Sequence, residues 1–220
     1  MSKQSERERQ EMVERQLERR GIRDPLVLDA MRRVPREEFV PPEHRDRAYE
    51  DRPVAIGEGQ TISQPYIVAY MIEALELKGG EKVLEIGGGS GYAAAVLASI
   101  ASHVYTIERI PELADQARLN LAAAGIANVT VRCADGTEGW PDEAPFDAIL
   151  VSAGAPDLPR AVMQQMAMGA RMVVPIGEDP TAQELVRFCR TGPGDFERTS
   201  LTAVRFVPLI GREGWEPGVV

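Results

Sequence analysis

Short apolar runs alternate with segments of helical spacing from Lys82 onward, and this alternation constrains the fold more than any other feature of the sequence. The short runs suit buried strands, and the longer segments between them suit helices. Strands that alternate with helices form right-handed βαβ units, so their sheet is mostly parallel. The sequence therefore predicts the α/β class, with a doubly wound, Rossmann-like sheet covered by helices.

The predicted sheet has seven strands, of which the last two form an antiparallel edge. Gly192, Pro193 and Gly194 separate these two strands, and such a cluster is typical of a tight connection. Their order within the sheet stays open. We expect strands at 83–86, 103–108, 129–133, 146–152, 171–176, 185–189 and 203–209, and helices at 64–75, 92–100, 111–124 and 159–168.

The N-terminal part of the chain lacks this alternation. Residues 5–20 are predicted to form a charged helix, and Asp24 followed by Pro25 is typical of an N-cap and a first helical position. Prolines beyond this second helix indicate an irregular stretch up to Gly59. We expect one domain over residues 1–220, in which 1–60 form a helical N-terminal extension packed on a Rossmann-like core of 61–220.

A glycine-rich loop follows the first strand of the core, with the sequence Gly87-Gly88-Gly89-Ser90-Gly91. Glycine lacks a Cβ atom, so such a loop turns tightly and lets a ligand approach the backbone. In doubly wound sheets, ligands bind beyond the carboxyl ends of the strands. Glu108 ends the next strand about 20 residues later, where an acid binds ribose hydroxyls. The loop and this acid together predict a nucleoside site.

The spacing of the glycines distinguishes two classes of nucleoside site. A dinucleotide loop requires a third small residue where this chain has Tyr92. The G-x-G-x-G spacing found here, with Glu85 two residues before the first glycine, resembles the loop of S-adenosylmethionine methyltransferases, whose cofactor has no pyrophosphate. An NAD-binding module is the weaker alternative. The predicted cofactor-binding residues are Glu85, Gly87, Gly89, Ser90, Gly91, Glu108, Arg109, Asp135 and Gly136.

Asp135 and Gly136 follow the third core strand, at the same edge of the sheet as the glycine loop. A carboxylate at this place can accept a hydrogen bond from the exocyclic amine of adenine. An Asp-Gly pair is also typical of a simple turn. The position in the topology favours the cofactor role.

Further segments of the chain carry a distinctive pattern. The most specific is 57–65, Gly-Glu-Gly-Gln-Thr-Ile-Ser-Gln-Pro. Together with the segments Val34–Val40, Leu84–Gly87, Ala144–Ile149 and Val204–Leu209, it closely resembles the protein-L-isoaspartate O-methyltransferase family. The resemblance extends from about Met12 to Leu209. The chain departs from the family at Gly88, where Thr or Ser is common, and at Ala134, where Gly is common.

The resemblance implies a protein repair enzyme. It moves the methyl group of S-adenosyl-L-methionine to the free α-carboxylate of L-isoaspartyl, and also D-aspartyl, residues in damaged proteins, and the ester leads through a succinimide back to aspartate. The resemblance implies that Ser63 is the active-site residue, that Thr61 and Ile62 lie in the same substrate loop, and that Val207 flanks the bound isopeptide. From the residues alone, Ser63 is also a candidate N-cap of the helix that follows it.

The expected reaction requires neither a general base nor a metal. A carboxylate with a pKa of about 4 is ionised at neutral pH, and it can attack a sulfonium methyl directly. The two histidines, His44 and His103, lie outside the proposed site. S-adenosyl-L-methionine is thus the only cofactor that we expect, and isoaspartyl peptides and damaged proteins are the expected partners.

The charge of the chain bears on other kinds of partner. A formal net charge of -9 disfavours nucleic acid, because proteins that bind it usually carry a basic face. No apolar run approaches the roughly 20 residues of a membrane span. The main alternative is a methyltransferase for a small molecule or for RNA, but the loop at 152–155 lacks the acceptor side chains used in base methylation. We expect a cytoplasmic monomer that binds neither nucleic acid nor membrane.

Overall fold

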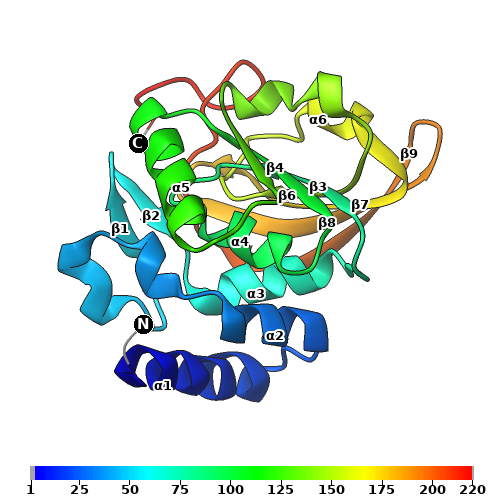
Figure 1. Ribbon diagram of the computed structural model, residues 1–220. Helices are drawn as coiled ribbons and strands as arrows, with labels where there is room; N and C mark the ends of the chain where they lie inside the picture. Colours follow the sequence, from blue (N-terminus) through cyan, green and yellow to red (C-terminus); the bar gives the residue numbers. More distant parts are fainter. Residues whose placement is uncertain (1–2, 220) are drawn as a thin grey trace.

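Seven strands hydrogen-bond in the order β5-β4-β3-β6-β7-β8-β9 in the computed structural model, which describes residues 3–219 (Figure 1). The strands from β5 to β7 are parallel, and β8 and β9 add antiparallel at one edge. The predicted fold class and its antiparallel edge are confirmed. The strands are β3 (Lys82–Ile86), β4 (His103–Glu108), β5 (Val129–Cys133), β6 (Phe146–Val151), β7 (Met166–Asp179), β8 (Ala182–Gly192) and β9 (Asp195–Val204).

Helices cover both faces of this sheet (Figure 1). The side chains of α2 to α5 belong to one hydrophobic cluster, and α6 adds Val162 to the cluster on the opposite face. The helix start predicted at Asp24 is confirmed, because its carboxylate accepts from the N–H groups of Leu26 and Val27. The helices are α1 (Lys3–Met12), α2 (Pro25–Arg33), α3 (Pro65–Ala74), α4 (Tyr92–Ala98), α5 (Pro111–Ala123) and α6 (Arg160–Gln164).

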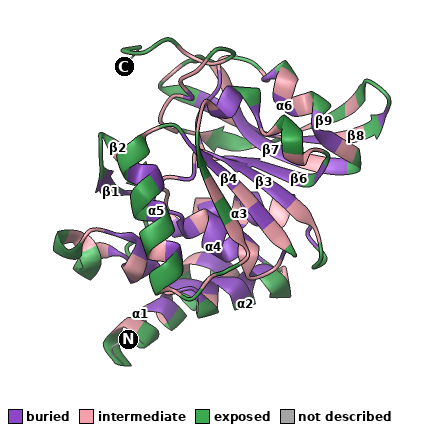
Figure 2. Ribbon diagram, turned by 45° about the horizontal axis from the view of Figure 1, so that its top comes forward, coloured by how far each residue is buried: buried purple, intermediate pink, exposed green. Residues whose placement is uncertain are grey.

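The central strands are buried on both faces, which explains their continuous apolar runs. Val83 points into one hydrophobic cluster and Leu84 into the other, and both side chains are fully buried. Figure 2 shows the same burial along the neighbouring strands. Each such side chain contributes about 1.5–3 kcal/mol when it leaves water. This packing fixes the strand ends at which the site lies.

The N-terminal helix is longer than α1 itself. It continues through a π-helical turn (Val13–Leu17) and a 3₁₀ turn (Glu18–Arg20), and Gly21 ends it with a φ of 103°. Leu17 is fully buried in the same cluster as one face of the sheet. The helix predicted over 5–20 is therefore confirmed.

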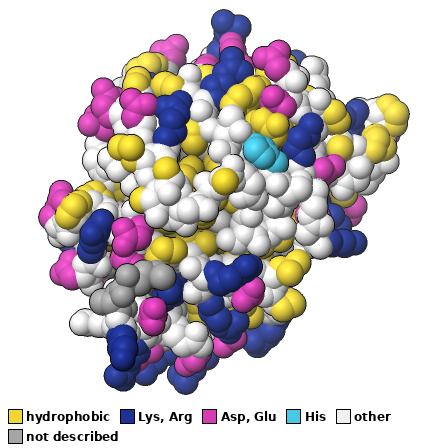
Figure 3. Space-filling model, viewed as in Figure 1, with side chains coloured by type: hydrophobic (Ala, Val, Ile, Leu, Met, Phe, Trp, Pro, Cys, Tyr) yellow, Lys and Arg dark blue, Asp and Glu magenta, His cyan; other side chains and the backbone are white. Residues whose placement is uncertain are grey.

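The solvent-facing side of this helix carries charges of both signs, and Figure 3 shows basic and acidic side chains intermixed on this part of the surface. Glu11 pairs with Arg7 at 3.1 Å and with Arg15 at 3.5 Å. Exposed pairs at this spacing contribute about 0.3–0.5 kcal/mol each. The apolar side of the helix, not its charges, holds it on the protein.

A short hairpin lies where the sequence indicated only an irregular stretch. It consists of β1 (Val54–Gly57) and β2 (Gln60–Ile62), which pair antiparallel. The expected boundary at residue 60 falls inside this hairpin, so the extension is not purely helical. Gly57 and Gly59 have positive φ, and strands this short carry too few residues for an alternating pattern to be visible.

The end of the chain departs from the prediction. The strand expected at 203–209 is wrong: β9 ends at Val204, and the next residues leave the sheet. They cross the loop after β6, where Val207 O accepts from Gly154 N at 2.8 Å and Leu209 N donates to Gly154 O at 2.8 Å. β9 is an edge strand with almost no buried side chain, so its sequence has no apolar run.

The helix predicted at 159–168 is also partly wrong. Only Arg160–Gln164 is helical, because Met166 already belongs to β7 and pairs with Phe146 of β6. The Gln165 side chain accepts from Trp140 N at 2.7 Å and donates to Glu138 O at 2.9 Å. These long-range contacts end the helix earlier than the apolar spacing of the sequence predicts.

Across residues 3–219, each helix is too short or too polar to cross a membrane. Over the same residues, His, Cys, Asp and Glu side chains form no group of three that is close enough to hold a metal ion.

Candidate cofactor and substrate site

The site lies where the direction of strand connection changes. β3 pairs with β4 on one side and with β6 on the other, so the loops after these three strands meet at one edge. Gly87 N donates to Ile107 O at 2.9 Å, and Ser152 N donates to Ile86 O at 2.8 Å. A crevice outside the carboxyl ends of strands at such a point is where doubly wound proteins bind ligands.

The glycines of the loop have the backbone conformation that the spacing predicts. Gly87, Gly89 and Gly91 have φ values of 86°, 52° and 87°, a region that other residues rarely adopt. Gly88 has a different reason to lack a side chain, since an added Cβ would lie 2.5 Å from Thr106 Oγ1. The absence of a side chain at Gly88 thus leaves room for the Thr106 hydroxyl.

Glu108 joins two loops at this edge. One carboxylate oxygen accepts from Gly89 N at 2.8 Å, and the other accepts from Ile110 N at 2.9 Å. The residue is 7% exposed. Each carboxylate oxygen has a second lone pair, so Glu108 can shape the glycine loop and still accept a hydroxyl group.

Glu85 is a buried carboxyl group with half of its hydrogen-bonding capacity unused. Its Oε2 accepts from Thr106 Oγ1 at 2.6 Å, while Oε1 has no partner among the described residues. Burial raises the pKa of Glu85 to about 8, and the charge of Glu108 adds to the effect, although the Thr106 hydrogen bond opposes it. A buried acceptor without a partner costs about 1–3 kcal/mol. A cationic ligand group beside Glu85 removes that cost.

Three cavities adjoin one another, and the glycine loop lines two of them. The inner cavity, of about 40 Å³, is lined by Glu85, Ile62 and the loop itself. The side cavity, of about 100 Å³, is lined by Glu108, Arg109 and Gly136. The open cavity, of about 780 Å³, lies beyond Ser63. Thr61 and Ser152 line all three, so the cavities adjoin one another and share walls.

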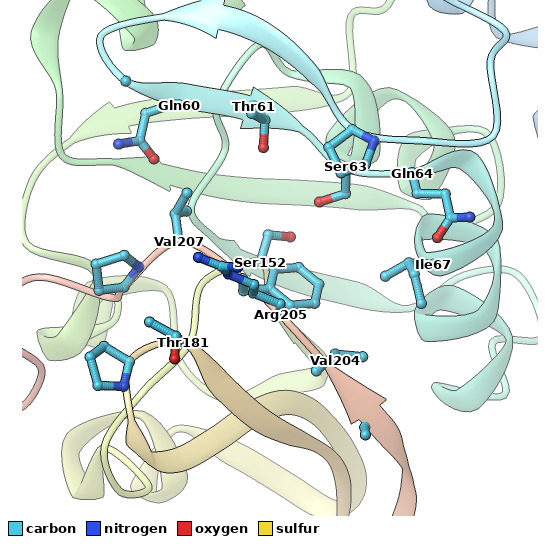
Figure 4. A pocket seen from close by; sticks show the side chains of 16 residues that line it. Gln60, Thr61, Ser63, Gln64, Ile67, Ser152, Thr181, Val204, Arg205 and Val207 are labelled. Carbon is cyan, nitrogen blue, oxygen red and sulfur yellow. The ribbon is translucent and has the colours of Figure 1, made fainter. Parts of the chain in front are cut away.

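The open cavity lies between β2 and the segment that follows β9 (Figure 4). Thr61 and Ser63 point their hydroxyl groups from one wall toward Val207 and Arg205 on the other. Arg205 is the one charged side chain among the described residues that line this cavity. The walls thus combine hydroxyl groups, apolar surface and one positive charge, which suits an extended anionic peptide.

Ser63 does not cap the following helix. The N-cap position of α3 is Gln64, and its side chain makes no capping hydrogen bond. Within residues 3–219, the Ser63 hydroxyl has no hydrogen-bond partner, and the residue lines both the inner and the open cavity. The alternative in which Ser63 serves as the cap is therefore wrong, and its hydroxyl is available to a ligand.

Asp135 is engaged by the C-terminal segment. Its Oδ1 accepts from Thr137 N at 2.9 Å and from Thr137 Oγ1 at 2.7 Å, and its Oδ2 accepts from Arg212 N at 2.8 Å. Although burial alone would raise it, the pKa of Asp135 is lowered by these donors. Asp135 is not among the residues that line the side cavity, whereas Gly136 is. Among the described residues Oδ2 accepts this one hydrogen bond and has a second lone pair, and contact with adenine stays a prediction.

Sequence reasoning did not assign Ser152 or Thr106 to the site. Ser152 follows β6 as Gly87 follows β3, and its position directly after a buried strand is a signal that could have found it. Thr106 lies inside β4 and is fully buried. No local pattern separates Thr106 from an ordinary strand residue, since its contact with Glu85 arises only from strand pairing.

Comparison with known proteins agrees with this geometry. The family model of protein-L-isoaspartate(D-aspartate) O-methyltransferase matches residues 7–214. The chain is 62% identical to "Protein-L-isoaspartate O-methyltransferase 1" of Rhodopseudomonas palustris (strain HaA2), over 94% of this chain and 85% of that protein. It is 60% identical to "Protein-L-isoaspartate O-methyltransferase 2" of Marinobacter nauticus, over 94% of each chain.

Solved structures give the same result. One protein-L-isoaspartate O-methyltransferase superposes with a TM-score of 0.84 at 30% identity, covering 94% of this chain and 67% of that one. A putative protein-L-isoaspartate O-methyltransferase from Plasmodium falciparum, in complex with S-adenosyl-L-homocysteine, gives a TM-score of 0.78 at 28% identity and covers 90% of this chain and 96% of that one. The chain therefore belongs to the protein-L-isoaspartate(D-aspartate) O-methyltransferase family.

Proposed function

We propose that this protein transfers the methyl group of S-adenosyl-L-methionine to the free α-carboxylate of L-isoaspartyl, and also D-aspartyl, residues in damaged proteins. The observation that carries the proposal is the joining of two sites. A glycine-loop crevice with two buried acids adjoins a peptide-sized cavity, and Ser63, whose hydroxyl has no partner among the described residues, lines both.

The residues of the inner and side cavities fit S-adenosyl-L-methionine. Within residues 3–219, Glu85 Oε1 is a buried acceptor without a partner, which suits the ammonium group of the methionine part. Glu108 suits the ribose hydroxyls, and the glycine loop admits a ligand close to its backbone. The residues that we assign to cofactor binding are Glu85, Gly87, Gly89, Ser90, Gly91, Glu108, Arg109, Asp135 and Gly136.

The substrate carboxylate binds, in this proposal, beside Ser63. The cofactor supplies an electrophilic methyl group on a sulfonium ion. Ser63 donates a hydrogen bond to one carboxylate oxygen and turns the other toward the cofactor, and Thr61, Ile62 and Val207 flank the isopeptide. No proton leaves, because the carboxylate is already ionised. Catalysis then rests on positioning and on exclusion of water.

The product ester is a better electrophile than the carboxylate. The next backbone nitrogen attacks it and expels methanol, which closes a succinimide, and hydrolysis returns part of the product as normal aspartate. Repair therefore requires only the methyl transfer from this chain. A cytoplasmic location, a monomeric state and the absence of nucleic-acid and membrane partners stay predictions from the sequence.

The direct test is transfer of labelled methyl from S-adenosylmethionine to synthetic peptides. We expect base-labile label on an isoaspartyl peptide and none on the peptide of the same sequence with normal aspartate. Only the isoaspartyl residue has a free α-carboxylate, because in normal aspartate that carboxyl group forms the peptide bond. A D-aspartyl peptide forms a third arm. Equal labelling of both L-peptides refutes the specificity, and no labelling of either refutes the reaction.

Replacing Ser63 with alanine tests the acceptor site. We expect kcat/KM for the isoaspartyl peptide to fall about 10-fold or more, the effect of losing one hydrogen bond to a charged group. Cofactor affinity should change little. Ser102→Ala is the matched control, because the Ser102 hydroxyl bonds Glu81 O at 2.8 Å before β4, at the other end of the sheet. A Ser63→Ala variant as active as the control removes Ser63 from the mechanism.

A further inference from the structure

Arg36 is a buried cation beneath the substrate loop. The residue is completely buried, and no carboxylate lies within 4.0 Å of its guanidinium among the described residues. Its nearest acidic neighbour in the chain, Glu37, pairs instead with Arg9 at 3.8 Å and accepts from the Tyr49 hydroxyl. Burial of a charge without a counter-ion lowers the stability of the folded protein by several kcal/mol, so a buried Arg36 is retained at a cost in stability.

The guanidinium makes two hydrogen bonds, both to backbone carbonyl groups. Nε donates to Ala48 O at 2.7 Å, and Nη2 donates to Ser63 O at 2.8 Å. Nη1 has no partner among the described residues. The guanidinium also lies 4.8 Å from the centroid of the Tyr92 ring, and Tyr92 lines the inner cavity. Arg36 therefore lies in the core and directly contacts Ser63 and Tyr92, which line the site.

The bond to Ser63 O fixes the orientation of the peptide unit between Ser63 and Gln64. This peptide is trans, so its N–H points opposite to its C=O. Because Arg36 holds the carbonyl on the buried side, the N–H of Gln64 points away from Arg36, and both Ser63 and Gln64 line the open cavity. This N–H has no acceptor within residues 3–219.

Two free donors consequently lie next to each other at the cavity wall: the Ser63 hydroxyl and the Gln64 N–H. Donors that face a carboxylate in a site shielded from water bind it far more strongly than in solution. The positive charge behind them polarises the shared peptide and adds its own attraction, which is screened less than that of a surface charge because Arg36 is buried.

We propose that Arg36 is a positioning residue that aims the Ser63–Gln64 peptide and supplies the positive charge for the acceptor carboxylate of the substrate. In this role the incoming carboxylate is the counter-ion that the guanidinium lacks. The inference rests on the proposed function, because it assigns the acceptor carboxylate to the Ser63 side of the open cavity.

The test compares two peptides of one sequence, an isoaspartyl peptide with its free α-carboxylate and the same peptide with an α-carboxamide there. Their dissociation constants are measured by calorimetry on protein saturated with S-adenosylhomocysteine, which has no methyl to transfer. The ratio of the two constants measures preference for the anion, and a general loss of stability cancels in it.

Wild-type protein should prefer the carboxylate, and Arg36→Met should lose that preference by about 10-fold. Arg36→Gln is a second neutral variant in case the first does not fold. Arg36→Lys keeps the charge and should retain most of the preference. Arg9→Met is the control, because it breaks a buried ion pair in the same layer without touching Ser63.

A folded neutral variant with the wild-type ratio overturns the inference, as does Arg36→Lys falling as far as Arg36→Met. An equally lowered ratio in Arg9→Met also overturns it, since the preference would then not depend on the contact between Arg36 and Ser63. These outcomes are distinct from failure of the proposed function, in which the wild-type protein does not methylate the isoaspartyl peptide at all.

Discussion

Replacing Glu108 with alanine is expected to weaken the binding of S-adenosylmethionine by about 1–3 kcal/mol, the effect of losing a hydrogen bond to a charged group. In the free protein, Glu108 accepts from the N–H groups of Gly89 and Ile110. The substitution therefore removes the proposed ligand contact and also leaves the N–H groups of Gly89 and Ile110 without their acceptor. The loop should be less well ordered, and the association rate should fall together with the affinity.

Calorimetric titration with S-adenosylhomocysteine measures this loss without turnover. Glu112→Ala is the matched control, because it removes the same charge from the exposed first turn of α5, only four positions further along the chain. Glu108→Gln separates the two roles, since it keeps one acceptor oxygen and loses the charge. Unchanged affinity in Glu108→Ala would exclude this residue from the cofactor site.

Replacing Glu85 with glutamine is expected to change how stability depends on pH. The pKa of Glu85 in the folded protein is raised to about 8, first by burial and then by the charge of Glu108, from an unfolded value near 4.5. Between these two values the folded state holds one proton more than the unfolded state. The contribution of Glu85 to the free energy of unfolding is therefore fully present below pH 4.5, and it is lost as the pH rises through 8.

The size of this effect follows from the shift. One pKa unit corresponds to about 1.4 kcal/mol, so the wild-type protein should lose up to a few kcal/mol between pH 5 and pH 9 through Glu85 alone. Glutamine cannot ionise and keeps an acceptor for the Thr106 hydroxyl. Urea unfolding of the ligand-free proteins at several pH values measures the difference. Parallel pH profiles for the two proteins would contradict the assigned cause.

The same ionisation should couple to cofactor binding. A cationic ligand group beside Glu85 favours the charged carboxylate, so binding of S-adenosylmethionine should release a proton near neutral pH. Affinity of the wild-type protein should therefore rise from pH 6 to pH 8, whereas that of Glu85→Gln should stay flat and weak. Calorimetry in buffers of different ionisation enthalpy counts the released proton, and its absence would place the ammonium group elsewhere.

The core strands and the cofactor loop were predictable from local pattern. Strands buried on both faces require continuous apolar runs, as in β3 and β6. A loop with three residues at positive φ requires glycine at those positions, so the G-x-G-x-G spacing encodes its own backbone conformation. The choice of Glu108 as a candidate ribose ligand followed from its spacing of about 20 residues from that loop. The substrate, by contrast, followed from the resemblance of 57–65 to a family and not from any physical pattern.

The edge of the sheet was not predictable in the same way. β9 forms because the turn at Gly192–Asp195 brings it alongside β8, and its exposed side chains need no apolar pattern. The apolar residues after Val204 suggested a strand. Instead, they hydrogen-bond to the loop after β6 and line the open cavity. The local sequence correctly indicated extended backbone after Val204. Tertiary packing decided that this segment hydrogen-bonds to the loop after β6 and not to β8.

The sequence by itself thus determined the fold class, the central strands and the conformation of the glycine loop, because each depends on residues that are neighbours in the chain. Only the tertiary structure decided that Glu85 keeps an unpartnered oxygen, that Thr106 occupies the space left by Gly88, and that Arg36 reaches Ser63, 27 residues away. The physical reason is that burial and hydrogen-bond partners are properties of a place in the folded molecule. Strand pairing and helix packing bring together side chains that no spacing along the chain connects.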